Sequence, residues 1–167
     1  LRGEPVPRSV RLLRWVERAL APQPSQPVQL REAQRTAAAW IAISCLGVGI
    51  RHRDYAALRV LSTILGSGFA SRLFTEIREK QGLAYQVSSS YPTRVGPTTL
   101  TLIAGTDPQN QTRVFELMQR EVASLRDTPV SDAELERARN RVIGLHAIDH
   151  EDLRNQAFYL GWYELLG

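Results

Sequence analysis

The sequence has 167 residues, of which 43% are hydrophobic and 23% charged, and its formal net charge is +4. These values are ordinary for a single globular domain with a hydrophobic core. The arginines are spread along the chain, whereas a nucleic-acid groove usually has a dense basic stripe with interleaved aromatic residues, so we expect no nucleic-acid binding. The single cysteine, Cys45, excludes an intrachain disulfide and a cysteine-based zinc knuckle. No apolar run is long enough to cross a bilayer.

Residues 1–26 are predicted to form a connecting helix and a proline-rich linker. Between Val6 and Leu20 apolar residues are interleaved with arginines, as in a short basic amphipathic helix. Such a helix fits a membrane surface, but its short length favours packing on its own domain. The prolines of "APQPSQP" forbid helix and indicate the linker. We expect one domain over residues 27–167, and we expect a cut at its start because the chain lacks an initiator Met.

The next segments predict two strands and two helices. Residues 28–49 suggest two strands around a turn near Gln34 and Arg35, and the second, Thr36 to Leu46, is apolar on both faces like a central strand. The stretch "RDYAALRVLSTILG" predicts a helix, and "ASRLFTEIREKQ" predicts another that ends at Gly82. The first helix has an apolar stripe of Tyr55, Leu58, Leu61 and Leu65.

Two more strands and a helix-rich end complete the domain. The strands are "LAYQVSSSYP" and "TTLTLIAGT", and Asp107 with Pro108 suits the start of the helix that follows. The residues "SDAE" from Ser131 to Glu134 form a capping box for a further helix, and a last helix starts near Glu151. Strands adjacent in sequence favour antiparallel pairing, so we predict an α+β fold with helices on one face of the sheet. The capped helix should direct Leu135, Ala138, Val142 and Leu145 inward.

The pentapeptide "HAIDH", His146 to His150, has two histidines four residues apart and an acid between them, as in many zinc sites. It is close to the H-x-x-E-H signature of inverted zinc peptidases. That signature needs a third ligand far downstream, but only 17 residues follow His150. On an ideal helix Asp149 would point near the centre of the apolar stripe, with His146 at its edge. These directions do not converge on a metal, so we predict no metal site in this chain.

Other catalytic patterns are weaker. The glycine-rich loop of Gly66, Ser67, Gly68 and Phe69 leads into a helix, but it joins two helices and not a strand to a helix as a dinucleotide site requires. No G-x-S-x-G nucleophile motif occurs, and His52 stands alone in a charged loop. Arg78 near a helix end and Tyr85 after the Gly82 turn could both reach one edge of the sheet, where each can donate hydrogen bonds to a carbonyl or oxyanion. From their positions alone, the simpler interpretation is that Arg78 is a solvated cation and Tyr85 an aromatic residue of the sheet.

The stretch from Asp54 to Tyr91 resembles the pitrilysin/insulinase family of zinc peptidases, which includes mitochondrial processing peptidase and core subunits of the respiratory cytochrome complex. The similarity extends from about residue 27 to the end, and it is to the second domain of that family, which lacks the zinc motif. The matching motifs are Asp54-Tyr55, Leu65-Gly66-Ser67-Gly68, Ser71-Arg72-Leu73, Arg78-Glu79-Lys80-Gln81-Gly82-Leu83-Ala84-Tyr85 and Ser88-Ser89-Ser90.

The resemblance implies one half of a two-domain clam that encloses a peptide. In such enzymes the first domain carries H-x-x-E-H and zinc, and the second supplies an arginine and a tyrosine seven residues apart. Arg78 and Tyr85 have that spacing, so we assign them to the site, and we assign the Gly66 to Phe69 loop to substrate binding. The family's zinc motif lies early in the first domain, so the resemblance implies that "HAIDH", which lies late in this chain, matches the motif only by chance. The family domain also usually continues past a point like Gly167, so we expect a cut at the C-terminal end as well.

The expected function is therefore that of a non-catalytic C-terminal domain that binds peptide and completes the active site of a zinc-bearing H-x-x-E-H partner domain. The partner would be in the same chain or a separate subunit, and self-association is also expected. The alternative is a purely structural assembly subunit, like the respiratory core proteins. We expect a bacterial protein, with the periplasm slightly favoured over the cytoplasm.

Overall fold

The computed structural model describes residues 26–32 and 37–166. The chain divides into two units, residues 1–35 and 36–167. The connecting helix, nearly all of the linker, and the turn near Gln34 and Arg35 lie outside the described residues. Residues 26–32 contain neither helix nor strand, so the strand predicted from Val28 is absent there. Val28 and Leu30 are 67% and 91% exposed, which shows that their alternating pattern does not correspond to a buried sheet face.

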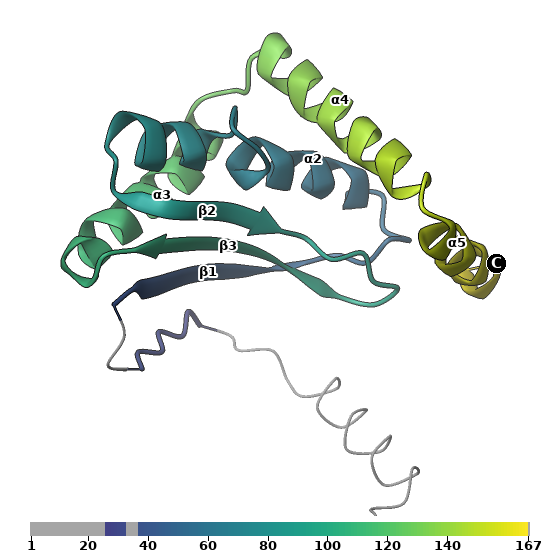
Figure 1. The fold of residues 1–167 in the computed structure, drawn as a ribbon, viewed down its shortest axis with the longest axis horizontal. Coiled ribbons are helices and arrows are strands. Elements are labelled where there is room, and N and C mark those ends of the chain that lie inside the picture. Colours follow the sequence, from purple (N-terminus) through teal and green to yellow (C-terminus); the bar gives the residue numbers. More distant parts are fainter. Residues whose placement is uncertain (1–25, 33–36, 167) are drawn as a thin grey trace, which may run out of the picture. The chain divides into compact units, whose positions relative to one another are not determined.

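The second unit contains a three-stranded antiparallel sheet in the order β1-β3-β2 (Figure 1). Its strands are β1 (Ala39–Gly47), β2 (Ala84–Ser90) and β3 (Thr98–Thr106). Within the described residues β3 is the central strand, and the segment predicted to be central, Thr36 to Leu46, lies in the edge strand β1. That prediction was wrong because apolar residues on both faces of a segment do not reveal how many neighbours it has. From Ala39 to Ser44, half-buried residues of β1 alternate with exposed ones.

Helices cover one face of this sheet, as predicted for an α+β fold (Figure 1). They are α2 (Tyr55–Gly66), the π-helical segment η1 (Phe74–Lys80), the short 3₁₀ helix η2 (Pro108–Asn110), α3 (Gln111–Asp127), α4 (Asp132–Asp149) and α5 (Leu153–Leu166). The opposite face of the sheet carries the other half of each strand's residues, and we call it the open face. No helix in the described part of the chain is long and apolar enough to cross a membrane.

The hydrophobic core lies between the sheet and the first layer of helices. Its centre is β3, where Leu102 and Ala104 are 1% and 0% exposed. Leu73 and Ile77 anchor η1 to this layer, since both are fully buried. Burying a large aliphatic side chain stabilises a fold by about 1.5–3 kcal/mol, so these contacts hold η1 firmly on the sheet. Helix α3 contributes Val114, Leu117 and Met118, and β1 contributes Ile41 and Ile43.

Helix α4 lies against α2 in an outer layer, away from the sheet (Figure 1). Ala138 is 5% exposed, but Leu135 and Leu145, predicted to point inward, are 38% and 40% exposed. Leu135 and Leu145 are more exposed than predicted because α2 alone covers a narrower stripe of α4 than a whole sheet would cover. Ser131 caps the helix as predicted, since its Oγ accepts a hydrogen bond from the Glu134 N–H at 3.3 Å. The Glu134 carboxylate does not complete the capping box but binds Arg72.

Candidate functional site

Arg78 projects from η1 into solvent. The preceding residue, Ile77, is fully buried, so the helix turns Arg78 outward. Its guanidinium carbon lies 5.1 Å from the centre of the Phe74 ring, within cation–π range. Helix η1 is π-helical, a geometry that is rare and frequent at functional sites. Arg78 is therefore an exposed cation that an aromatic ring on its own helix holds in place.

The chain reverses directly after η1 and leads into Tyr85. Gly82 has a φ of +63°, a conformation that favours glycine, and the Leu83 N–H donates to the Ile77 carbonyl at 3.0 Å. Ala84 pairs with Thr106, and Gln86 pairs with Gly105. Tyr85 is consequently the extra residue of a β-bulge, a feature that often re-aims a side chain beside an active site.

The bulge places the Tyr85 ring over Gly105 of β3. A Cβ atom built at Gly105 would lie 2.8 Å from Cε2 of Tyr85, so the ring covers the glycine closely. The Trp40 ring of β1 stands at 88° to the Tyr85 ring, with their centres 6.1 Å apart. The Tyr85 side chain is 48% exposed, and its hydroxyl makes no hydrogen bond to any residue that the structure describes. The phenol is thus a hydrogen-bond donor that remains available to a ligand.

No hydrogen bond or ring interaction joins Arg78 and Tyr85 in the described part of the chain. Among the described side chains, Arg78 contacts the Phe74 ring, whereas Tyr85 contacts Trp40 and lies over Gly105. The two belong to successive elements, joined by the tight turn at Gly82. They are consequently two separate donors, one at the end of η1 and the other at the start of β2.

The predicted substrate loop begins where α2 meets β2. A Cβ atom at Gly66 would lie 2.6 Å from the backbone nitrogen of Ser89, so α2 ends in direct contact with the sheet. The Ser67 Oγ accepts a hydrogen bond from Arg141 Nε of α4 at 3.1 Å. Gly68 has a φ of +95°. The loop therefore needs glycine at two positions. Gly66 leaves room for the backbone of β2, and Gly68 adopts a positive φ.

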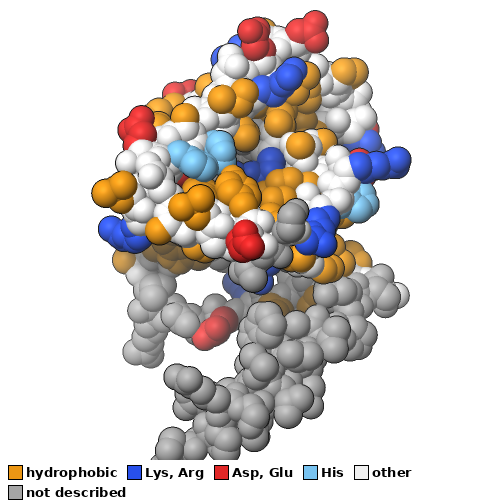
Figure 2. All heavy atoms as spheres, turned by 90° about the vertical axis from the view of Figure 1, so that its right-hand side faces the viewer, with side chains coloured by type: hydrophobic (Ala, Val, Ile, Leu, Met, Phe, Trp, Pro, Cys, Tyr) orange, Lys and Arg blue, Asp and Glu red, His pale blue; other side chains and the backbone are white. Residues whose placement is uncertain are grey.

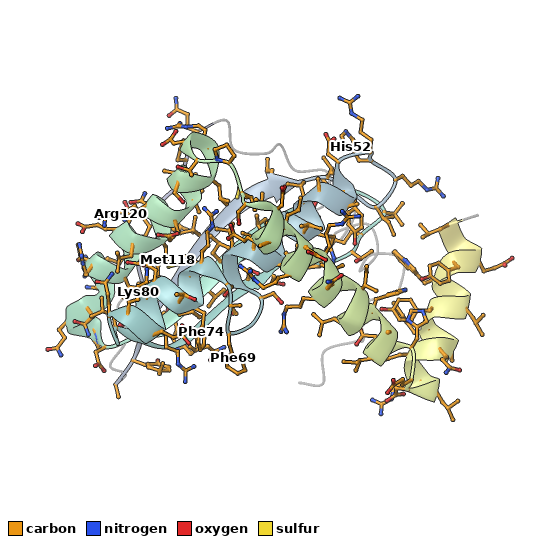
Figure 3. All side chains as sticks on the ribbon, turned by 90° about the horizontal axis from the view of Figure 1, so that it is seen from above. His52, Phe69, Phe74, Lys80, Met118 and Arg120 are labelled. Atoms are coloured by element: carbon orange, nitrogen blue, oxygen red, sulfur yellow. The ribbon has the colours of Figure 1, made fainter. Side chains whose placement is uncertain are left out.

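Phe69 connects this loop to Arg78. Its side chain is 78% exposed, and its ring centre lies 5.1 Å from that of Phe74 at an angle of 73°. Figure 3 shows the two phenylalanines next to each other. Since Arg78 lies over the same Phe74 ring, the three side chains form a continuous row along the surface. The row joins two parts of the predicted site.

The histidines of "HAIDH" lie at the end of α4. The ring centres of His146 and His150 are 4.1 Å apart, and the His150 ring stacks on Tyr159 of α5 at 4.3 Å. Nδ1 of His150 donates to the His146 carbonyl at 2.8 Å, since a carbonyl oxygen only accepts. Asp149 is exposed and does not point into a buried stripe, because α4 is largely uncovered near its end. No group of three histidine, cysteine or acidic side chains in the described residues is placed to hold a metal.

Trp40 and Phe74 contact the two candidate residues but were not among the residues predicted from the sequence. The signal for Phe74 was present, because it precedes Arg78 by four residues and side chains at that spacing meet on a helix. Trp40 left no comparable signal. It stands 45 residues before Tyr85, and only the strand pairing through β3 brings the two rings together.

A family model for the peptidase M16 inactive domain matches residues 12–142 of the sequence. The chain belongs to this family. Its relatives include the uncharacterized zinc protease YmxG of Bacillus subtilis, 28% identical over 138 residues, and an uncharacterized zinc protease of Streptomyces coelicolor, 30% identical over 161 residues. These alignments cover 83% and 88% of the chain but only 34% and 35% of the relatives, so the M16 inactive domain described here spans about a third of their length.

Solved structures have the same fold. The M16 inactive domain from Pseudomonas fluorescens is 27% identical, with a TM-score of 0.66 over 78% of this chain and 32% of that one. The inactive peptidase domain of a protein from Bordetella parapertussis is 23% identical, with a TM-score of 0.70 over 84% and 75% of the two chains. The chain is thus an α+β M16 inactive domain of a zinc protease family with bacterial members, as its resemblance predicted.

Proposed function

We propose that this M16 inactive domain encloses a peptide substrate together with a zinc-bearing H-x-x-E-H domain and completes its active site. One observation carries the proposal. The bulge at Tyr85 exposes a phenol that has no hydrogen-bond partner among the described residues. A purely structural subunit has no need for such a donor, whereas peptide hydrolysis does.

Tyr85 would act on the carbonyl oxygen of the scissile bond. Zinc in the partner domain would supply the activated water that attacks this carbonyl. As negative charge develops on the oxygen, the neutral Tyr85 hydroxyl donates a hydrogen bond to it. A neutral donor can lie beside a metal cation without repelling it, which is why we give this role to Tyr85 and not to Arg78.

Arg78 would bind the peptide elsewhere. Its guanidinium can donate to a substrate carbonyl, and its contact with Phe74 limits the orientations that it adopts. The exposed Phe69 ring extends the same row and offers an apolar contact to a substrate side chain. In this proposal the Gly66 to Phe69 loop and Arg78 hold the peptide, and Tyr85 stabilises the charge that forms during the reaction.

Steady-state kinetics of this chain combined with the zinc-bearing domain test the proposal, with a fluorogenic peptide as substrate. Losing one oxyanion donor typically lowers kcat by about 10²–10³, so Tyr85→Phe should lower kcat strongly while zinc content stays unchanged. Arg78→Ala should raise KM as well, because it removes a contact to the bound peptide.

Two substitutions far from the site serve as controls. Tyr163→Phe removes the hydroxyl of a tyrosine that is also 48% exposed, and Arg53→Ala removes an arginine whose side chain is 90% exposed. Both should leave kcat and KM at the wild-type values. If Tyr85→Phe and Arg78→Ala also leave kcat and KM unchanged, the domain supplies no group to the reaction and functions as a structural subunit.

A further inference from the structure

The position of Tyr85 depends on its contacts with the other two strands of the sheet, β3 and β1. Trp40 of β1 pairs with Gly105 of β3, and Tyr85 is the bulged residue of β2 on the other side of the same glycine. The two aromatic rings therefore meet above Gly105 on the open face, although they come from opposite edges of the sheet. Their perpendicular arrangement, with centres 6.1 Å apart, is the edge-to-face geometry that aromatic pairs prefer.

Gly105 makes this arrangement possible. A Cβ atom there would lie 2.8 Å from Cε2, 3.0 Å from Cζ and 3.1 Å from the hydroxyl oxygen of Tyr85. Any side chain at this position would therefore lift the ring away from β3. With glycine, the backbone of β3 supports the ring from below and the Trp40 ring meets it from the β1 side.

The Trp40 contact does not belong to the hydrophobic core. Trp40 is 59% exposed and Tyr85 48% exposed, and both lie outside the cluster of buried side chains. Removing the Trp40 ring should thus cost little folding stability. It should instead free the Tyr85 ring, which has no hydrogen bond to a described residue to hold it.

We propose that Trp40 is a positioning residue that holds the Tyr85 hydroxyl in its catalytic orientation above Gly105. This inference rests on the proposed function of Tyr85. A hydrogen-bond donor stabilises a developing charge best when its orientation is fixed before the reaction. A mobile donor would have to be oriented anew in each turnover, which costs free energy. An edge-to-face pair is worth about 0.5–1.5 kcal/mol, which corresponds to a roughly two- to tenfold preference for the productive orientation.

The contact can be measured in the chain itself by ¹⁹F NMR after incorporation of 3-fluorotyrosine. The Tyr85 signal is assigned from its loss in Tyr85→Phe. In the wild-type chain we expect this signal to be displaced by the ring current of Trp40. In Trp40→Ala the signal should move to the position of an exposed tyrosine, and in Trp40→Phe it should stay between the two. Trp162→Ala, which removes a tryptophan stacked on Phe158 of α5, should leave it unchanged.

Kinetics with the zinc-bearing domain test the consequence. Trp40→Ala should lower kcat by about two- to tenfold with little change in KM, Trp40→Phe should recover part of the loss, and Gly105→Ala should lower kcat by displacing the ring directly. If Tyr85→Phe lowers kcat but Trp40→Ala does not, the positioning role is wrong and the proposed function stands. If Tyr85→Phe has no effect, the proposed function itself fails. An unchanged Tyr85 signal in Trp40→Ala would likewise overturn the positioning role.

Discussion

At the scale of single residues, the ion pair of Arg72 and Glu134 joins three segments of the domain. Arg72 Nε and Nη2 donate to the two carboxylate oxygens of Glu134 at 2.7 and 2.8 Å, and Nη1 donates to Ser124 Oγ of α3 at 3.2 Å. Both charged side chains are less than a fifth exposed. The hydrogen bonds from Arg72 hold the pKa of Glu134 below its ordinary value, in spite of its partial burial.

We predict that Glu134→Gln destabilises the domain by about 1–3 kcal/mol at neutral pH, because it leaves Arg72 without its charged partner. A carboxyl group whose pKa is lowered by folding contributes stability above its unfolded pKa, and this contribution is lost as the pH falls through the folded value. The destabilisation should therefore shrink in acid. Urea unfolding at several pH values measures it. Glu136→Gln, on the exposed side of α4, is the control, and an equal loss of stability in both variants would contradict the assignment.

At the scale of elements, the close approach of α2 to β2 depends on the absence of a side chain at Gly66. The backbone nitrogen of Ser89 would lie 2.6 Å from a Cβ atom there. Hydrogen bonds add to the same contact, since Ser89 Oγ donates to the Ser62 carbonyl at 2.6 Å and Ser62 Oγ donates to Ser89 Oγ at 3.1 Å. The substrate loop starts from this joint, so its position depends on the helix–strand distance.

Gly66→Ala should destabilise the domain by about 1–3 kcal/mol, because the backbone of β2 must move to accept the methyl group. Gly144→Ala is the matched control. Gly144 lies within α4, and nothing lies within 4 Å of a Cβ atom there, so alanine should stabilise the helix by roughly 0.5–1 kcal/mol. Thermal unfolding compares the two variants. Equal shifts in the same direction would show that steric contact at Gly66 is not decisive.

The end of α4 carries a second prediction at this scale, namely that the purified chain retains no stoichiometric zinc. His146 and His150 contact each other and the Tyr159 ring, and the described residues offer them no third ligand. Catalytic zinc needs three protein ligands and an open position. Metal analysis after dialysis measures the bound zinc. About one tightly held zinc per chain that is lost in His146→Ala would refute the prediction.

At the scale of the whole molecule, α4 and α5 leave an unusual amount of apolar surface exposed. Figure 2 shows hydrophobic side chains gathered on the face that carries the two neighbouring histidines. Scattered exposed apolar residues are normal, but a gathered set of this kind marks an interaction surface. The exposed apolar residues of α4 and α5 include Ile143, Ile148, Leu153, Phe158 and Leu160, each more than 60% exposed.

We predict that the isolated chain self-associates or binds the zinc-bearing domain through its exposed apolar surface. Sedimentation velocity over a range of concentrations measures self-association, and the same experiment with the zinc-bearing domain measures binding. Leu153→Glu and Leu160→Glu place charges on α5 and should weaken either interaction, whereas Arg126→Glu on α3 should not. The prediction would be ruled out if the chain stays monomeric at high concentration and does not bind the zinc-bearing domain.

Features whose causes are local could be predicted from the sequence alone. The alternating residues of β3, the glycine after η1 and the serine cap of α4 were all predicted correctly, because periodicity, positive φ and capping act over a few residues. The α+β fold followed from the order of the predicted strands and helices, and the family followed from short motifs in one continuous stretch. The candidate residues Arg78 and Tyr85 came from the same stretch, and their role remains a prediction.

Which segments of the chain contact each other became known only from the folded structure. It placed β1 at an edge of the described sheet, left much of α4 exposed, joined Arg72 to Glu134 across 62 positions, and brought Trp40 to Tyr85 over Gly105. None of these contacts leaves a periodic or local signal, because each depends on strand order, a bulge or helix packing. For this reason the sequence indicated the donors of the candidate site, and the fold indicated what holds them in place.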